Sequence, residues 1–237
     1  MSIDALIQIK SLEFSYPNDP GFALNIPSLS IEKSDRVFLE GPSGCGKTSI
    51  LNLMTGLMLP QAGTIDVLGS DITQLSAVQR DRFRADHFGI IFQLFNLIPY
   101  LSVIENIILP CTFSRSKRKK ALQRSVPLGD EARRLCQGLD IAEELMQRPV
   151  QQLSIGQQQR VAIARALIGQ PEIIVADEAT SALDDERKSQ FMELLIRECD
   201  RHQSALIFVS HDRQLKSQFA SSYQLSELNT ESASVTA

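Results

Sequence analysis

Hydrophobic and polar positions alternate near the start of the chain. Between Ala5 and Ile31 apolar residues recur at about every second position, at Ile7, Ile9, Leu12 and Phe14 and then at Phe22, Leu24 and Ile26. This period is typical of half-buried strands, so we expect antiparallel strands there. Further strands are predicted at Val37 to Glu40, Gly63 to Leu68 and Phe88 to Phe92.

The pattern changes to a helical period further along the chain. Residues 97 to 150 carry apolar residues three and four positions apart, at Ile104, Ile107 and Ile108 and at Ala132, Leu135, Cys136 and Leu139. Helices and continuously apolar strands then alternate, which predicts an α/β fold with buried parallel strands. These elements are expected at Gln157 to Leu167, Ile173 to Ala176, Glu186 to Cys199 and Ala205 to Val209.

Composition narrows the functional class. The 237 residues carry a net charge of −4, which argues against general nucleic-acid binding. No apolar run approaches the ~18 residues of a membrane helix, and no N-terminal signal pattern is present. The four cysteines lack C-x-x-C spacing, which is consistent with reduced cytosolic thiols. The basic cluster Arg115 to Lys120 indicates a solvated helix face or a contact with anionic lipid or a partner.

A glycine-rich phosphate signature follows the predicted strand Val37 to Glu40. Its residues fit G-x-x-x-x-G-K-[ST], and helically spaced apolar residues come after it. Glycines let backbone N–H groups turn toward phosphates, and a helix N-terminus adds about half a positive charge. Lys47 can reach the β- and γ-phosphates, and the Thr48 hydroxyl can ligate Mg²⁺. The predicted nucleotide-binding residues are Gly41, Pro42, Ser43, Gly44, Cys45, Gly46, Lys47, Thr48 and Ser49.

Two carboxylates stand at the end of the predicted strand Ile173 to Ala176. In an open α/β sheet such strand ends lie beside the phosphate loop. Asp177 is therefore predicted to hold Mg²⁺, and Glu178, which points differently, to polarise the attacking water. A solvated pair that only caps the strand is the alternative interpretation, since acidic pairs are common.

These segments and several others resemble the ATP-binding subunits of ABC transporters over nearly the whole chain. Leu153 to Gln157 is similar to the signature LSGGQ, with Ile155 at its third position. Asp177 to Asp184 is similar to the acidic strand end and D-loop, with Ala179 in place of the usual proline. Single residues match at Gln93 in the Q-loop, at the switch histidine His211, and at Tyr16, where an aromatic stacks on adenine.

The resemblance implies a P-loop NTPase fold of the ABC type. Its ATP-binding core would carry an N-terminal antiparallel β subdomain and an inserted α-helical subdomain. One domain is expected over residues 1–228, with the helical subdomain at about 97–168. The Ser/Thr/Ala/Glu-rich composition of residues 229–237 predicts a disordered tail.

The resemblance also implies how ATP and Mg²⁺ are used. Two subunits would form a head-to-tail, ATP-dependent homodimer, with each ATP between one phosphate loop and the other subunit's signature. Ser154, Gly156 and Gln157 would cap the γ-phosphate from across the interface, which Asp184 would cross. His211 would bond the γ-phosphate, and Gln93 would sense Mg²⁺ and the attacking water. The implied catalytic residues are Glu178, His211, Gln93 and Lys47, and the metal-binding residues are Thr48, Gln93 and Asp177.

The departures from the family pattern keep alternatives open. If the position of Ile155 needs a positive φ, a β-branched residue is strained there; if only its backbone N–H is used, Ile is tolerable. Ala179 should loosen one turn only. We expect ATP hydrolysis, and the alternatives are a regulatory nucleotide-binding module with weak turnover and a non-transport ABC ATPase. The latter class usually carries coiled-coil or zinc insertions or tandem ATPase halves, which this sequence does not have.

One branch of the family is favoured. Gln93 to Ile107 and Arg80 to Arg84 resemble the lipoprotein-release and macrolide-export branch. The implied partner is an integral-membrane permease, with no nucleic acid, and the implied location is the cytoplasmic face of the inner (plasma) membrane through that permease. The expected permease contact is an apolar patch, or else buried core, formed by Phe95, Leu97, Ile98 and Leu101.

Overall fold

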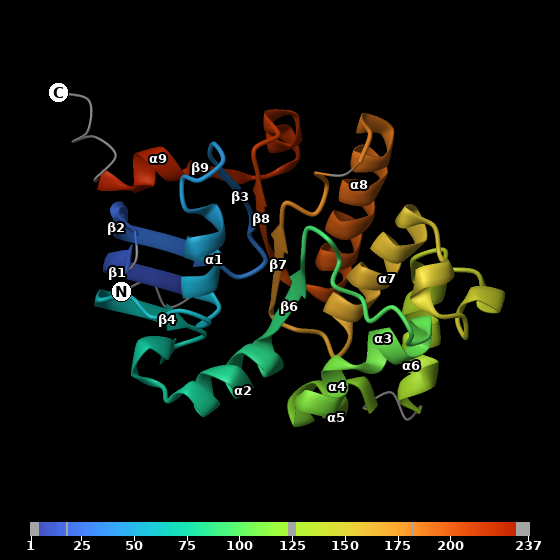
Figure 1. Cartoon of the computed structure of the whole chain (residues 1–237). Helices are drawn as coiled ribbons and strands as arrows, with labels where there is room; N and C mark the ends of the chain where they lie inside the picture. The colour runs from blue at the N-terminus through green and yellow to red at the C-terminus, as the bar shows by residue number, and fades with distance from the viewer. Residues whose placement is uncertain (1–4, 18, 123–126, 182, 231–237) are drawn as a thin grey trace. The chain divides into compact units, whose positions relative to one another are not determined.

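The computed structural model describes residues 5–17, 19–122, 127–181 and 183–230 and divides into two compact units (Figure 1). The first unit comprises residues 1–84 and 207–237, and the second comprises residues 85–206. Helix α2 (Ala77–His87) and strand β8 (Ala205–Ser210) run across this division. The second unit is thus one continuous insertion between two segments of the first.

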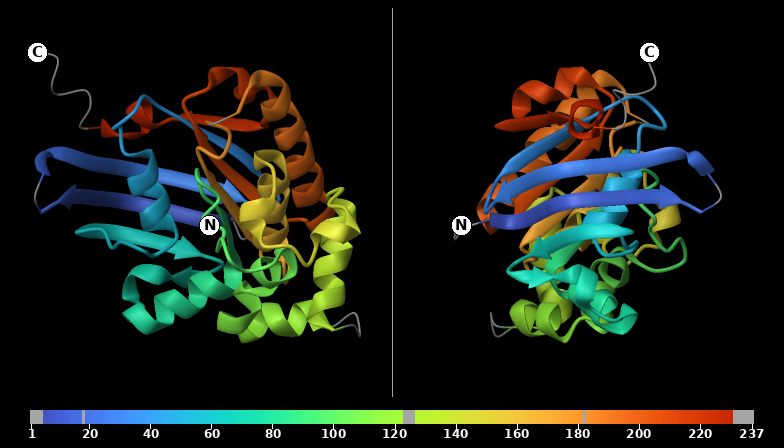
Figure 2. Two further views of the ribbon diagram at one scale, coloured as in Figure 1. Left: turned by 45° about the vertical axis from the view of Figure 1, so that its right-hand side comes forward. Right: turned by 90° about the vertical axis from the view of Figure 1, so that its left-hand side faces the viewer.

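A four-stranded antiparallel sheet of order β2-β1-β4-β5 lies in the first unit (Figure 2). Inward side chains meet across the strands, as where Ile9 lies opposite both Leu29 and Ile65. Ser11 has a left-handed φ of 48° where the register of β1 against β4 shifts, and Ile9 and Leu12 on either side both stay buried. The predicted antiparallel strands are confirmed; they are β1 (Ala5–Tyr16), β2 (Asp19–Glu32), β4 (Ala62–Val67) and β5 (Ser70–Asp71).

The first unit also contains a parallel pair, β3 (Arg36–Glu40) with β9 (Ser221–Gln224). Three aromatic rings pack together in its core: Phe38 lies 6.3 Å from Phe208 and 5.2 Å from Phe219, between ring centroids. Besides α2, the described part of the unit contains the helices α1 (Lys47–Met54) and α9 (Leu225–Leu228) and the 3₁₀ helices η1 (Ile72–Gln74) and η4 (Arg213–Gln218), and of these only α1 was predicted.

Asn229 and Thr230 are hydrogen bonded to β2, although the composition of residues 229–237 predicted a disordered tail there. Asn229 is buried; its Oδ1 accepts from the Asn25 N–H at 2.8 Å and its Nδ2 donates to the Ala23 carbonyl at 2.8 Å. Thr230 Oγ1 donates to the Asn25 carbonyl at 3.2 Å. The ordered chain therefore reaches Thr230, which corrects the start of the predicted tail, and residues 231–237 lie outside the described residues.

The second unit combines parallel strands with helices. Strand β6 (Phe88–Ile91) pairs in parallel with β7 (Ile173–Asp177). A Cβ at Gly89 would collide with the Ala166 carbonyl of α7, so glycine is what allows β6 to approach this helix. The helices are α3 (Val103–Ile108), α4 (Pro110–Phe113), α5 (Arg115–Leu122), α6 (Leu128–Gly138), α7 (Ile155–Leu167) and α8 (Asp185–His202), with 3₁₀ helices η2 (Glu143–Leu145) and η3 (Val150–Gln152). Among the described helices none is both long and apolar enough to cross a membrane.

The basic cluster lies on α5, and its cations do not share one environment. Lys117 is buried, and its Nζ donates to the Phe88 carbonyl at 2.6 Å. Burial lowers the pKa of Lys117 to about 8. Lys120 forms an ion pair with Glu172 at 2.7 Å, and Glu172 also contacts His87 Nδ1 at 3.0 Å. The predicted solvated helix face therefore consists only of the other three cations, Arg115, Arg118 and Lys119.

The contacts of Glu172 predict how stability responds to pH. Burial opposes the charge of this carboxylate, but hydrogen bonds from His87 and Lys120 outweigh burial and lower its pKa to about 2. A carboxylate with a folded pKa below its ordinary value of 4.5 stabilises the protein above that pH and loses this contribution as the pH falls toward 2. Because the partly exposed pairs are screened by water, Glu172→Gln should lower the free energy of unfolding by about 1 kcal/mol at pH 7 and by less at pH 3.

Urea denaturation of both proteins at the two pH values measures these differences. Glu144→Gln is the matched control, because Glu144 is exposed and forms no ion pair with any other described residue. An equal destabilisation by Glu172→Gln at pH 7 and pH 3 would contradict the role given to the charge of Glu172.

Candidate functional site

The phosphate loop of the first unit connects β3 to α1 through backbone that only glycine adopts easily. Gly44 and Gly46 have φ values of 81° and 101°. A Cβ at Gly46 would lie 2.8 Å from the Phe22 ring and 2.9 Å from Leu24, and one at Gly41 would collide with Cys45 Sγ. Gly46 caps α1 without a side-chain hydrogen bond, and the first turn holds no carboxylate. The helix N-terminus is therefore suited to an anion.

Lys47 is folded against its own loop. Its side chain is 6% exposed, and Nζ donates to the carbonyls of Gly41 at 2.8 Å and Pro42 at 2.9 Å. Thr48, the next residue, is exposed at the start of α1. The ammonium group and the hydroxyl thus lie in one helical turn, next to the backbone N–H groups of the loop.

Tyr16 and His211 are the other predicted site residues of the first unit. The Tyr16 hydroxyl is 2.9 Å from Ser49 Oγ, so Tyr16 is tied to the phosphate-loop helix. Its half-buried ring lies edge-on to Phe14 at 4.9 Å and tilted against Phe22 at 5.4 Å. His211 is exposed and directly follows the last residue of β8.

The two predicted carboxylates of the second unit are adjacent but turn apart. Asp177 is the last residue of β7, and Glu178 has a left-handed φ of 48°, uncommon for a residue other than glycine. A turn follows at once, with the Ser181 N–H bonded to the Glu178 carbonyl at 3.0 Å. Both side chains are half-buried. The chain therefore changes direction sharply between the two carboxylates and the D-loop.

Helix α7 begins at Ile155, two residues earlier than predicted. Ser154 is its N-cap: Ser154 Oγ accepts from the Gln157 N–H at 3.3 Å, and Gln157 Oε1 accepts from the Ser154 N–H at 2.9 Å. Ile155 is therefore a helical residue with no positive φ, and its side chain is half exposed. The strain considered for this position does not arise, because the position does not need a glycine conformation.

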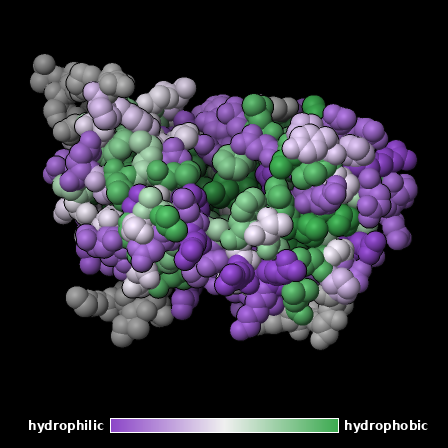
Figure 3. Space-filling model, turned by 60° about the horizontal axis from the view of Figure 1, so that its bottom comes forward, coloured by the Kyte–Doolittle hydropathy of each residue, from purple (hydrophilic) through white to green (hydrophobic). Residues whose placement is uncertain are grey.

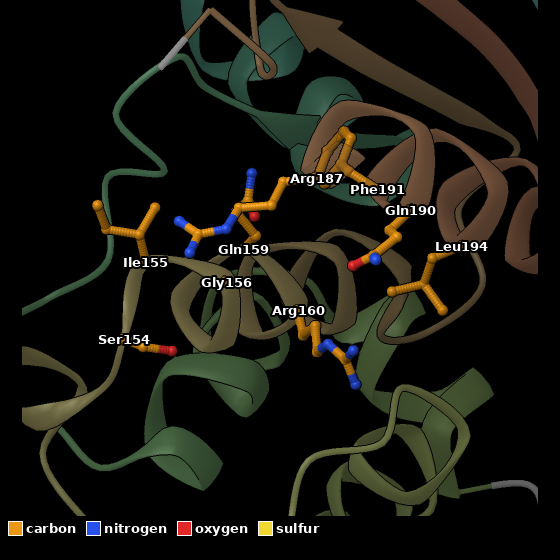
Figure 4. A pocket seen from close by; sticks show the side chains of 9 residues that line it. All are labelled: Ser154, Ile155, Gly156, Gln159, Arg160, Arg187, Gln190, Phe191 and Leu194. Atoms are coloured by element: carbon orange, nitrogen blue, oxygen red, sulfur yellow. The ribbon is translucent and has the colours of Figure 1, made fainter. Parts of the chain in front are cut away.

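A cavity of about 260 Å³ opens between the start of α7 and helix α8 (Figure 4). Gln159 is buried there, and its Nε2 has no hydrogen-bond partner within the described part of the chain. Asp184 caps α8 by accepting from the Arg187 N–H at 2.9 Å and contacts Arg187 Nε at 3.4 Å. Ala182, two residues before Asp184 in the D-loop, lies outside the described residues.

Gln93 is exposed after β6, and the backbone beyond it is held in an unusual conformation. Phe95 and Asn96 have left-handed φ values of 58° and 45°. Arg165 of α7 donates from Nη2 to the Phe95 carbonyl at 2.5 Å and from Nη1 to the Asn96 carbonyl at 2.6 Å. Burial of the Arg165 guanidinium group lowers its pKa. The group offsets the cost of its burial by donating one hydrogen bond to each of the two carbonyls.

Asn106 holds the next part of this segment. It is fully buried; its Oδ1 accepts from the Ile98 N–H at 2.8 Å, and its Nδ2 donates to the carbonyls of Ile98, Leu101 and Ser102. Phe95 is only 7% exposed, so its expected place in a surface patch was wrong and the core alternative holds for it. The strongly exposed large apolar side chains here are Leu94 at 78% and Tyr100 at 74%.

The predicted site residues therefore fall into two groups. The phosphate loop, Tyr16 and His211 belong to the first unit, whereas Gln93, the two carboxylates, the α7 start and Asp184 belong to the second. Within the described residues no group of three or more His, Cys, Asp or Glu side chains could hold a metal ion. Arg165 and Asn106 were missed, because their roles depend on backbone carbonyls that no sequence motif marks.

Comparison with known proteins places these features in a family. The family model for ABC transporters matches residues 24–181. The lipoprotein-releasing system ATP-binding protein LolD of Hydrogenovibrio crunogenus is 32% identical, with 94% of this chain and 95% of that protein covered. The macrolide export ATP-binding/permease protein MacB of Shigella flexneri is 37% identical over 90% of this chain, which spans only 32% of that longer protein.

A solved structure agrees with the sequence relatives. The dimeric ATP-binding cassette MJ0796, in a post-hydrolysis state bound to ADP and Pi, is 30% identical and superimposes with a TM-score of 0.77. The match covers 92% of this chain and 93% of that one. The chain therefore belongs to the ABC transporter ATP-binding family and is an ABC-type ATPase.

Proposed function

We propose that this ATPase dimerises head to tail on ATP and drives a separate integral-membrane permease of the lipoprotein-release or macrolide-export type. The observation that carries the proposal is the exposed start of α7, where Ser154, Ile155 and Gly156 form a capped helix N-terminus without a carboxylate in its first turn. Such an end attracts a phosphate, and it is available to a second subunit. The argument for a module of weak turnover loses its basis, because Ile155 has helical backbone.

The two relatives support the nature of the partner. One is named as part of a lipoprotein-releasing system, and the other as a joint ATP-binding and permease protein. This chain corresponds to about a third of the joint protein. In our proposal the permease is a separate chain. Through it the ATPase would sit on the cytoplasmic face of the inner membrane.

ATP with Mg²⁺ is the proposed ligand of the predicted site residues. Thr48 and Asp177 would hold the ion with Gln93 beside it; Mg²⁺ commonly takes only one or two protein carboxylates and completes its shell with phosphate oxygens and water. When bound, the ion would neutralise charge on the β- and γ-phosphates. The Lys47 ammonium and His211 would bond the γ-phosphate, the half-buried Tyr16 ring would contact adenine, and Glu178 would accept a proton from the attacking water.

Exchange of Glu178 for glutamine tests the chemistry. Glu178→Gln removes the proton acceptor but keeps the shape, so it should lower hydrolysis at least about 100-fold while ATP binding stays within a few fold. Lys47→Ala should instead weaken binding itself, because the ammonium contacts phosphate in the ground state as well. Steady-state phosphate release and nucleotide titration separate the two effects. Turnover near that of the wild type in Glu178→Gln would remove this residue from the mechanism.

Mixing two inactive variants tests the head-to-tail dimer. Lys47→Ala damages the phosphate loop and Ser154→Arg the signature, so a mixed dimer should regain one intact composite site and hydrolyse faster than either variant alone. The matched control mixes Lys47→Ala with Glu178→Gln, whose defects fall on the same side of each composite site and should not complement. Full, concentration-independent turnover by a protein shown to be monomeric would contradict the dimer.

The permease contact is proposed for the segment that begins after Gln93. Leu94 and Tyr100 are its exposed apolar residues, while Arg165 and Asn106 hold the backbone between them. Arg165 also lies on the same helix as the signature residue Ser154. A rigid helix thus connects the proposed phosphate contact to the proposed permease contact, which gives Arg165 a positioning role.

Exchange of Arg165 for lysine tests that role. A lysine ammonium cannot reproduce the two-pronged contact to Phe95 and Asn96, so Arg165→Lys should lower permease-stimulated hydrolysis about tenfold and leave nucleotide affinity within twofold. Arg160→Lys is the matched control, because Arg160 also lies on α7 and donates to two carbonyls, those of Leu139 and Asp140, outside this segment. Hydrolysis is measured with and without permease in lipid; equal stimulation of both variants would refute the coupling role.

A further inference from the structure

Helix α5 presents three cations and one leucine on a single face. Arg115, Arg118, Lys119 and Leu122 are spaced at i, i+3, i+4 and i+7, which is one side of an α-helix. All four are exposed, and together they line a shallow hollow of about 430 Å³. The opposite side, with Lys117 and Ala121, is buried in the second unit. The face is therefore fixed in orientation by packing.

The positive charge of this face is not compensated by its surroundings. Helix α5 contains no acidic residue, and the three exposed cations form no ion pair with any described residue. The nearby carboxylates have other partners: Asp86 accepts a hydrogen bond from Ser114, Glu172 pairs with Lys120, and Glu131 pairs with Arg134. In a chain with a net charge of −4 this is a local positive field.

We propose that this face of α5 binds the surface of an anionic lipid bilayer. Cations flanking an apolar side chain on one helix face are typical of interfacial binding, in which headgroups meet the charges and the apolar side chain enters between them. Leu122 is 39% exposed, and Phe113, two residues before α5, is 73% exposed. Figure 3 shows one face of the molecule, on which hydrophobic and hydrophilic residues lie next to one another.

The charge of this face favours lipid over a protein partner. A protein partner with charges of both signs would leave an all-positive face partly unmatched, whereas anionic headgroups present only one sign. Each cation near such a surface strengthens binding roughly fivefold, so the three together contribute about 100-fold over a neutral bilayer. Because the Debye length is about 10 Å at 0.1 M salt, high salt should abolish this difference. Binding of α5 to lipid requires neither the permease nor a nucleotide. An experiment that refutes lipid binding would therefore leave the proposed ATPase function untouched, and the reverse also holds.

Vesicle flotation of the full chain tests the charges. Binding to vesicles of phosphatidylcholine with a third phosphatidylglycerol should exceed binding to pure phosphatidylcholine at least tenfold, and 0.5 M NaCl should remove the excess. Arg118→Glu with Lys119→Glu should reduce binding to the anionic vesicles at least tenfold. Arg148→Glu is the control, since Arg148 is an exposed cation of the same unit away from α5, and its effect should be less than threefold. Unchanged melting temperatures exclude misfolding.

A tryptophan probe tests the apolar part of the contact. The chain contains no tryptophan, so Phe113→Trp introduces a single tryptophan beside α5. Its emission should shift to the blue with anionic vesicles only, whereas Leu57→Trp, at a position of the first unit that is 53% exposed, should show no shift. Equal binding to both vesicle types, equal loss with Arg148→Glu, or a blue shift of the Leu57→Trp protein would overturn the proposal. So would binding of a short single-stranded RNA that depends on Arg118 and Lys119 while anionic vesicles do not bind.

Discussion

Helix α7 has to keep its first turn exposed while its middle is buried. Several contacts of the second unit serve these two requirements. Its first turn stays exposed, with Ile155 half in solvent, while Val161, Ala162 and Ile163 are fully buried. The Ser154–Gln157 capping box satisfies the exposed end without using a neighbouring element. At the other end Gly89 lets β6 lie close to the helix backbone. A helix fixed in this way spans about 20 Å as a rigid body, so its two ends cannot move independently.

Left-handed residues follow two of the proposed site residues of this unit. Glu178 turns the chain immediately after Asp177, and Phe95 with Asn96 turns it after Gln93. Each such residue costs about 1 kcal/mol or more against ordinary backbone. At Phe95 and Asn96 two charge-assisted hydrogen bonds from Arg165 offset that cost, and burial of the Phe95 side chain adds to the compensation. The conformation therefore depends on a residue about seventy positions further along the chain, through contacts that pin the segment from outside.

The sequence predicted those features that depend on residues close to one another along the chain. The strand–loop–helix context of Lys47 follows from glycines and apolar spacing alone, and the structure has it at the predicted place. The early start of α7 had a signal as well, because Ser154 followed three residues later by Gln157 is a capping box. The burial of Lys117 and Phe95 had none: both side chains sit where distant elements close over them, and a charge run or an apolar run does not reveal which of its members turns inward. Helix α2 was missed because none of its described residues is fully buried, so it lacks an apolar stripe.

The contacts of Lys47 show how the loop accommodates a largely buried charge. An ammonium group in a largely buried place has to be hydrogen bonded, and the Gly41 and Pro42 carbonyls provide this at 2.8 and 2.9 Å. These acceptors are neutral, whereas phosphate oxygens are charged and attract an ammonium group more strongly. In the proposed complex with ATP, Nζ would therefore exchange a carbonyl for a charged phosphate oxygen. We expect arginine to be a poorer replacement, because the donors of its planar guanidinium have a fixed geometry, whereas the three donors of an ammonium group rotate to suit the acceptors.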